Sequence, residues 1–313
     1  MWYGISDEKT LMKDILFVYN LCGLANDNTD KWIEIIDKWL EYRKDFDIAV
    51  SACNVSDKCK TKFTEHFKGK DIKINYIEDK LPVNITFNLN CKLNPGYKYY
   101  LYCSSDVEPN NQKNILKKMV DFHKSNNNGI TGAYVLHDSY HANYNYIRDI
   151  VRKTHYTFKP GESFNCHFAL YDGELINYYN SFMPDVFESF ATESVFYYVC
   201  AAINKNLGML SGLEITLFHP RHDMDGSSSF TKNRGWQFLY LVGDANKRLI
   251  TDEGRQAGFG YEEVNHIMPH KKELYENNKC KNPTKLLGFV KKAVYLQPNE
   301  FNYMDINYDS KLI

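Results

Sequence analysis

The chain has 313 residues, of which 43% are hydrophobic and 25% are charged, which is an ordinary globular composition. Its 38 basic and 39 acidic residues give a formal net charge of -1. This balance argues against non-specific nucleic-acid binding, because such binding depends on a basic excess. The length suits one large α/β domain, or one domain with an appended lobe.

Short apolar runs and amphipathic stretches alternate along the first part of the chain. The apolar runs predict strands over 15–20, 47–53, 71–77, 98–103 and 130–136. The spacing of apolar residues predicts helices over 30–42, 58–67, 82–93 and 114–124. Alternation at this pitch is typical of βαβ units, so we expect a mostly parallel central sheet flanked by helices.

The second part of the chain is less regular. We expect a further block at 164–170, a helix within 187–203 and a strand over 213–218. Residues 244–313 show no clear motif, and their composition suggests a surface lobe or an extended tail.

The cysteines and the start of the chain indicate a cytoplasmic protein without a transmembrane segment. Eight Cys are scattered without a CxxC pair, and several lie in apolar runs, where Cys behaves as a small buried hydrophobe. This usage favours a reducing compartment. The acidic first residues lack the apolar core of a secretory signal, and the longest apolar run, 195–203, is too short to span a bilayer.

Polar side chains follow the predicted strands at their carboxyl ends, namely Asn20, Asn54, Asp79 and Asp106. In parallel sheets, ligands bind beyond these ends of the strands. We therefore expect these side chains to converge on one crevice.

The segment from Ser104 to Glu108 is the strongest candidate for a metal site. Asp106 and Glu108 are two residues apart, so on extended backbone their carboxylates share a face. Hard oxygen ligands at a strand end suit Mg²⁺ or Mn²⁺ bridging a diphosphate. The alternative is a solvated acidic turn before Pro109.

A polar loop beyond the strand at 213–218 holds four side chains that could bind metal: His219, His222, Asp223 and Asp225. They could complete the coordination of a metal held by Asp106, and an imidazole suits Mn²⁺ better than Mg²⁺. The alternative is a polar loop in which His219 caps neighbouring backbone.

Glu193 lies among apolar residues near the expected helix start. Burial there would raise its pKa toward that of a useful general base. The alternative is an exposed or capping glutamate. No GxxxxGK[ST], GxGxxG or GxSxG motif occurs, so P-loop kinases, dinucleotide dehydrogenases and α/β-hydrolases are not first choices.

The order of these features resembles that of nucleotide-sugar glycosyltransferases with the GT-A fold, especially the glycosyltransferase family 2-like group. The resemblance covers roughly residues 14–230. The segments that carry it are 15–20, 49–54, 74–79, 81–90, 99–106, 192–193 and 219–225. It implies a Rossmann-like GT-A catalytic domain over 1–243 and a C-terminal acceptor-side extension over 244–313, packed on the same domain.

The resemblance also implies roles for individual residues. Asp106 is similar to the second Asp of an Asp-x-Asp motif, the direct metal ligand, and Ser104 stands where the first Asp would be. Glu108, His219 and His222 would complete a site for Mn²⁺ or Mg²⁺, and Glu193 resembles the general base. The nucleotide-contacting positions would be Tyr19, Asn20, Asn54, Asp79, Asn88, Ser104 and Ser105.

The implied reaction moves a sugar from a UDP- or GDP-sugar donor to a hydroxyl of a glycan or glycoconjugate acceptor. The cation would neutralise the diphosphate leaving group. Glu193 would take the acceptor's proton, and a single displacement would invert the anomeric centre, with retention as the alternative. Two rival functions stay open. One is a metal-dependent hydrolase built on the loop 219–225, and the other is a carbohydrate-binding protein that has lost catalysis.

Overall fold

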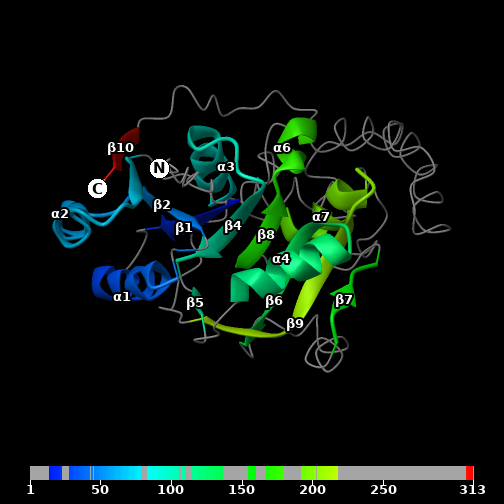
Figure 1. Cartoon of the computed structure of the whole chain (residues 1–313). Helices are drawn as coiled ribbons and strands as arrows, with labels where there is room; N and C mark the ends of the chain where they lie inside the picture. Colours follow the sequence, from blue (N-terminus) through cyan, green and yellow to red (C-terminus); the bar gives the residue numbers. More distant parts are fainter. Residues whose placement is uncertain are drawn as a thin grey trace, which may run out of the picture.

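The computed structural model (Figure 1) describes residues 14–22, 28–42, 44, 46–78, 83–105, 107–109, 115–136, 154–159, 167–179, 192–201, 203–217 and 308–312. Its helices are α1 (Thr29–Leu40), α2 (Asp57–His66), α3 (Val83–Leu93), α4 (Ile115–Ser125), α6 (Glu174–Tyr179) and α7 (Thr192–Ala201). Its strands are β1 (Ile15–Cys22), β2 (Asp47–Cys53), β3 (Lys73–Ile77), β4 (Tyr99–Ser104), β5 (Val107–Pro109), β6 (Asn128–Leu136), β7 (Tyr156–Thr157), β8 (Phe168–Asp172), β9 (Asn206–Leu217) and β10 (Tyr308–Leu312).

The strands of the described ranges form one sheet, in the order β10-β3-β2-β1-β4-β8-β6-β9-β5, with β7 beside β9. Strands β1, β2, β3, β4, β6 and β9 run in one direction, and β5, β7, β8 and β10 run in the other. The prediction of a mostly parallel central sheet flanked by helices is therefore confirmed.

Local sequence signals account for the N-terminal half of the fold. Strand β2 occupies the predicted range 47–53, and helices α1 to α4 each begin within one residue of the predicted start. The start of α2 is an example: the Ser56 hydroxyl caps this helix by accepting a hydrogen bond of 3.2 Å from the Cys59 amide. Such a cap satisfies one of the backbone donors left free at a helix start.

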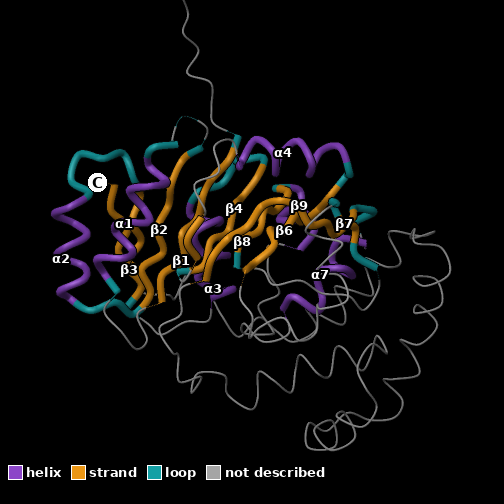
Figure 2. The backbone as a smooth tube through the Cα atoms, turned by 90° about the horizontal axis from the view of Figure 1, so that it is seen from below, coloured by secondary structure: helices purple, strands orange, loops and turns teal. Residues whose placement is uncertain are grey.

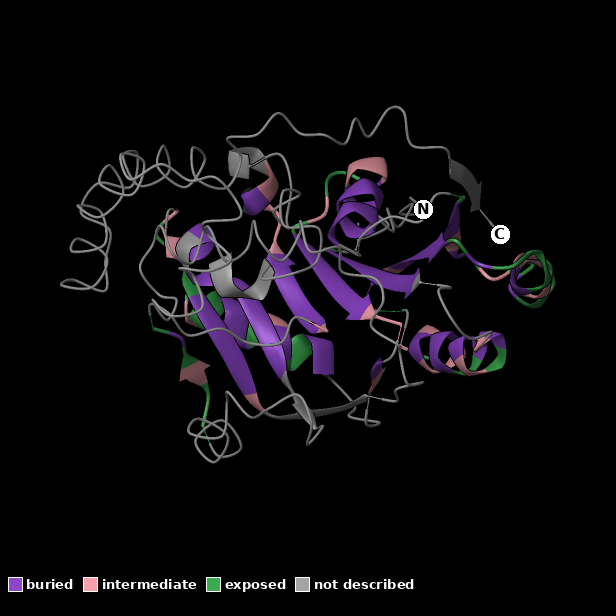
Figure 3. Cartoon of the chain, turned by 180° about the vertical axis from the view of Figure 1, so that it is seen from behind, coloured by how far each residue is buried: buried purple, intermediate pink, exposed green. Residues whose placement is uncertain are grey.

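Alternating side chains along β1 face two different helical layers. Phe17 and Tyr19 belong to the core shared with α1, α2 and α4. Asn20 faces the opposite side, where it contacts α3. Figure 2 shows the sheet between α4 on one side and α3 and α7 on the other. Figure 3 shows that the central strands of this sheet are buried while the outer side of α2 is exposed.

Trp39 fixes α1 to the sheet. Its side chain is 2% exposed, and its ring centroid lies 4.6 Å from that of Phe17 and 5.6 Å from that of Phe168. Truncating a buried aromatic residue of this size typically costs about 3–5 kcal/mol. The packing of Trp39 therefore fixes the position of α1, and of the side chains that α1 carries, relative to the sheet.

The end of the chain returns to the sheet. Strand β10 pairs antiparallel with β3, with Tyr308 opposite Ile77 and Leu312 opposite Lys73. No strand signal was apparent in this part of the sequence. The predicted domain boundary at residue 243 lies outside the described residues.

Five cysteines whose side chains the structure describes are buried and free: Cys53, Cys59, Cys91, Cys103 and Cys200. Among the helices that the structure describes, none combines the length and apolar character needed to cross a membrane.

Candidate functional site

The predicted metal segment connects β4 to β5. Strand β4 ends at Ser104 and β5 begins at Val107, so Ser105 and Asp106 form the connection. Asp106 itself lies outside the described residues. Its neighbours are well held, because Val107 is 0% exposed and the Ser104 amide donates a 2.8 Å hydrogen bond to the carbonyl of His167.

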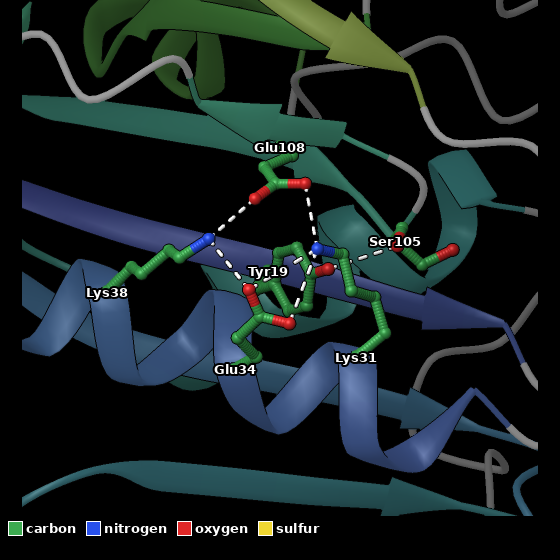
Figure 4. Close-up of polar contacts among 6 residues, drawn as sticks. All are labelled: Tyr19, Lys31, Glu34, Lys38, Ser105 and Glu108. Atoms are coloured by element: carbon green, nitrogen blue, oxygen red, sulfur yellow. Dashed lines mark hydrogen bonds and ion pairs between the residues drawn. The ribbon is translucent and has the colours of Figure 1, made fainter.

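Tyr19 supports this connection from β1. Its side chain is 0% exposed, and its hydroxyl donates a hydrogen bond of 3.0 Å to the Ser105 carbonyl (Figure 4). Tyr19 thus positions the backbone immediately before Asp106. A contact between Tyr19 and a nucleotide stays a prediction.

Glu108 lies against α1 in the structure. Its Oε1 is 2.6 Å from Lys38 Nζ and its Oε2 is 2.8 Å from Lys31 Nζ (Figure 4). Burial alone would raise the pKa of Glu108, but hydrogen bonds from Lys31 and Lys38 outweigh burial and lower this pKa. Each carboxylate oxygen thus has an ammonium partner. Its predicted role as a metal ligand is not tested by this arrangement.

The short strand β5 follows Asp106 and pairs with β9, the strand that precedes the loop 219–225. It pairs antiparallel with β9, with Val107 opposite Leu217. Asp106 directly precedes Val107 in the chain, and His219 follows Leu217 by two positions. His219 and His222 lie outside the described residues. The pairing fixes the points from which both segments leave the sheet.

Asn20 and Asn88, both predicted to contact the nucleotide, are 3% and 0% exposed. The Oδ1 atom of Asn20 accepts a hydrogen bond of 2.9 Å from the Thr86 hydroxyl of α3. Asn20 thus joins β1 to α3. For both residues, contact with a nucleotide stays a prediction.

A row of polar residues crosses the sheet beneath α3. Neighbouring strands place Ser104, Asn20, Ser51 and Asn75 opposite one another in register. The Asn75 amide donates a hydrogen bond to Asn90 Oδ1 of α3. Helix α3 is therefore attached partly by polar contacts. Periodicity in single segments could not reveal this row, because the register of separate strands creates it.

The ends of β2 and β3 are joined by Asn54. This residue is exposed and has a left-handed backbone with φ of 50°, a conformation that asparagine adopts more readily than most residues. Its amide donates a 2.8 Å hydrogen bond to the Ile77 carbonyl. Asn54 therefore lies at the edge where the parallel strands end. Asp79, the predicted nucleobase contact, lies outside the described residues.

Glu193 is in the first turn of α7, which begins at Thr192 within the described residues. Its side chain is not described. A Cβ placed on Gly129 would lie 3.0 Å from Cys200 Sγ, so the end of α7 lies beside the start of β6. Glu193 is seven residues earlier, about 10 Å along the helix. The first turn of α7 is thus displaced from the start of β6.

The sequence did not reveal three residues that contact the segment 104–108. Lys31 and Lys38 hold Glu108, and the carbonyl of His167 binds the end of β4. The seven-residue spacing of the two lysines on one helix was a usable signal. His167 carried none, because its place depends on the antiparallel insertion of β8 beside β4.

The described residues contain no group of three His, Cys, Asp or Glu side chains that could hold a metal ion. The predicted ligands Asp106, His219 and His222 all lie outside those ranges. A site formed by these predicted ligands would lie on the segments that leave β4, β5 and β9.

No protein-family model matches the sequence, and no curated protein matches it. Solved structures do share its fold. One is Staphylococcus aureus TarS, residues 1–349, in complex with UDP, with a TM-score of 0.53 and 11% identity over 96% of this chain and 97% of that one. Another is the mannosyltransferase PcManGT from Pyrobaculum calidifontis in complex with GDP-Man and Mn²⁺, with a TM-score of 0.52 and 10% identity over 92% and 76% of the chains.

A third structure is GalNAc-T7 with UDP, GalNAc and Mn²⁺, with a TM-score of 0.53 and 9% identity over 84% of this chain and 58% of that one. At identities this low, the structural likeness shows a shared fold and leaves the activity open. The sheet order, the helices on both faces and these likenesses together show that the chain has the GT-A fold.

Proposed function

We propose that this protein transfers a sugar from a UDP- or GDP-sugar to a hydroxyl group of a glycan or glycoconjugate, with a divalent cation and with inversion at the anomeric carbon. The observation that supports this most is the pairing of Val107 with Leu217 on a GT-A fold. It starts the Asp106 and His219 segments from neighbouring points. Opposed residues in such a pair are about 5 Å apart, and each further residue adds at most about 3.8 Å.

The choice of donor is supported by what related folds bind. The TarS structure contains UDP, and the PcManGT structure contains GDP-Man and Mn²⁺. In this chain the carboxyl ends of β1, β2 and β4 lie side by side. Ligands bind at such ends in open α/β sheets. Asn54, Ser104 and Ser105 lie there, which suits them to contact the nucleotide.

The proposed metal ligands are Asp106, His219 and His222, a mixed oxygen and nitrogen set that suits Mn²⁺. When bound, the cation would supply positive charge for the departing diphosphate. Glu108 enters this set only if it exchanges its lysine partners for the metal. The donor set fits a divalent cation in its chemistry. The pairing of Val107 with Leu217, the described residues nearest to these ligands, supports this proposal.

Glu193 is proposed to accept the proton of the acceptor hydroxyl as that oxygen attacks the anomeric carbon. Its position in the first turn of α7 supports this role, because the positive end of a helix dipole favours negative charge. One displacement by the acceptor on the face opposite the leaving group inverts the sugar. The C-terminal extension is proposed to bind the acceptor.

A thermal-shift screen tests the donor side of this proposal. The protein is heated with UDP, GDP, UDP-sugars and GDP-sugars, each with Mn²⁺ and with EDTA. A ligand at 100 times its Kd stabilises the folded state by about 2.7 kcal/mol, which raises the Tm by several degrees. We expect such a shift for one nucleotide series, and only with Mn²⁺. The same preparation is then incubated with a glycan array and the responding donor.

The outcomes separate the rival functions. Transfer of sugar to an array member supports the proposal. A metal that stays bound without nucleotide, with unchanged behaviour of an Asp106→Ala variant, favours the hydrolase built on 219–225. The absence of any nucleotide-dependent shift contradicts the proposal and favours the carbohydrate-binding protein.

A further inference from the structure

We propose that Lys31, Lys38 and Glu108 form a lysine clasp that positions the Asp106 segment for metal binding, and that Glu108 is a positioning residue. This inference rests on the proposed function. It concerns the contact between helix α1 and strand β5.

Both lysines reach Glu108 from one face of α1. Lys31 and Lys38 are seven residues apart, or about two turns, so their side chains point the same way. Glu34 lies between them and is 2.8 Å from Lys38 and 3.3 Å from Lys31 (Figure 4). Glu34 thus shares both ammonium groups with Glu108.

Helix α1 is anchored on both sides, which makes the clasp rigid at its base. Toward the sheet, Ile35, Ile36 and Trp39 are at most 2% exposed. Toward α2, Asp37 Oδ1 is 2.8 Å from Lys70 Nζ and Asp37 Oδ2 is 2.7 Å from His66 Nε2. A displacement of β5 therefore has to break the clasp, because α1 cannot follow it easily.

The residues directly before and after Asp106 are also held in place. The Tyr19 hydroxyl holds the Ser105 carbonyl, and Val107 is buried and paired with Leu217. The residues at positions 105, 107 and 108 are thus each fixed by a different element. Asp106 is the residue that these contacts enclose along the chain.

Two features favour positioning over ligation by Glu108. Each of its oxygens already has an ammonium partner at 2.6 or 2.8 Å, and the Glu108 side chain is only 24% exposed. A cation would have to displace two positive groups from a half-buried carboxylate. Contacts that orient a metal ligand from outside are typically worth about 10- to 100-fold in metal affinity.

The test compares removal of each half of the clasp. Mn²⁺ affinity is measured calorimetrically in the presence of UDP or GDP, whichever stabilises the wild type. The variants are Glu108→Gln, the double variant Lys31→Met with Lys38→Met, and the triple variant. Lys31→Arg with Lys38→Arg is the conservative rescue. Glu34→Gln is the matched control, because Glu34 binds the same lysines without touching β5.

Hydrogen exchange over residues 104–109 gives a second readout that needs no substrate. If the clasp positions this segment, Glu108→Gln, the lysine double variant and the triple variant should each lose Mn²⁺ affinity by a similar factor of about tenfold. The clasp also predicts faster exchange over 104–109 in all three. The arginine variant and Glu34→Gln should match the wild type in both measurements.

Two results would overturn the clasp. If Glu108→Gln weakens Mn²⁺ binding while the lysine double variant does not, Glu108 is a metal ligand. If exchange over 104–109 is unchanged in all variants, the contact does not hold this segment. A wild type that binds no Mn²⁺ with nucleotide contradicts the proposed function instead, and the exchange result alone then decides the clasp.

Discussion

The Tyr19 hydroxyl donates a 3.0 Å hydrogen bond to the carbonyl of Ser105, the residue before the predicted metal ligand. The Tyr19→Phe variant keeps the ring and removes this bond. Because the part-buried Ser105 carbonyl loses this partner, we expect a loss of about 1 kcal/mol in the free energy of unfolding. We also expect a higher Mn²⁺ requirement. Urea unfolding and Mn²⁺ titration of activity measure the two effects.

Tyr76→Phe is the matched control for that variant. The Tyr76 hydroxyl donates a 3.2 Å hydrogen bond to the Lys60 carbonyl in α2, away from Ser105. A similar loss of stability without any change in the Mn²⁺ requirement is expected. Equal Mn²⁺ requirements in both variants would show that Tyr19 has only a structural role.

The polar contact beneath α3 gives a double-mutant prediction. The Asn75 amide donates to Asn90 Oδ1, and both side chains are at most 1% exposed. Asn75→Leu alone leaves a buried acceptor with one partner fewer, so we expect a loss of about 1–3 kcal/mol. Asn75→Leu with Asn90→Leu should lose less than the sum of the single variants. Strict additivity in urea unfolding would mean that the two amides do not interact in solution.

Acid stability should depend on Asp172. Burial alone would raise its pKa, but His123, Lys205 and the Glu174 amide outweigh burial and lower the pKa from 3.8 to about 2. A carboxyl whose pKa is lower in the folded state stabilises the protein above its unfolded pKa. This contribution, about 2 kcal/mol, is therefore lost as the pH falls from about 4 to about 2. In Asp172→Asn, the unfolding free energy should lose this part of its pH dependence.

His123 should add a second, milder acid effect. Burial lowers its pKa from 6.5 although Asp172 opposes this, and its Nε2 lies 3.7 Å from Asp172 Oδ2. Because the unfolded chain takes up the proton more readily, stability should fall as the pH drops below about 6.5. Unfolding measured between pH 7 and pH 5 should become flatter in His123→Gln. An unchanged slope in that window would contradict the assignment.

The sequence predicted the N-terminal half of the fold well because its signals there are local. Strand β2 and the starts of α1 to α4 follow from apolar runs, helical spacing and caps such as Ser56. Two antiparallel strands, β5 and β10, were missed for a physical reason. Strand β5 has three residues, and β10 pairs with β3 across more than 200 residues of chain, so neither has a pattern of its own.

Strand β9 shows how a bulge hides a strand. The prediction began at residue 213, but the strand begins at Asn206. Its pairing with β6 shifts register between Leu210 and Glu214, and Gly208 and Gly212 interrupt the apolar alternation. A period of two could therefore be recognised only beyond the bulge.

The candidate site was predictable in part. The strand-end rule pointed to Asn54, which lies at the edge where the parallel strands end. The rule could not reveal that Asn20 binds Thr86, which is 66 residues away in the chain. It also could not reveal that Glu108 binds two lysines, of which Lys38 is 70 residues away. Residue type and position indicate possible ligands, and packing decides which neighbours they have.

Replacing the proposed base should separate chemistry from binding. Glu193→Gln keeps the size of the side chain and removes the proton acceptor. We expect kcat to fall by about 10²- to 10⁴-fold, with little change in the Kd of the donor. Single-turnover kinetics and calorimetry measure the two quantities. Near wild-type turnover would remove Glu193 from the proposed mechanism.

The most direct test of the proposed function is Mn²⁺-dependent transfer of labelled sugar from UDP- or GDP-sugars to a glycan array, measured for wild type and Asp106→Ala side by side. We predict that the wild type labels an acceptor only with Mn²⁺. We also predict that Asp106→Ala, with an unchanged Tm, loses at least about 100-fold in rate. Full metal-dependent transfer by Asp106→Ala, or no transfer by the wild type from any donor, would contradict it.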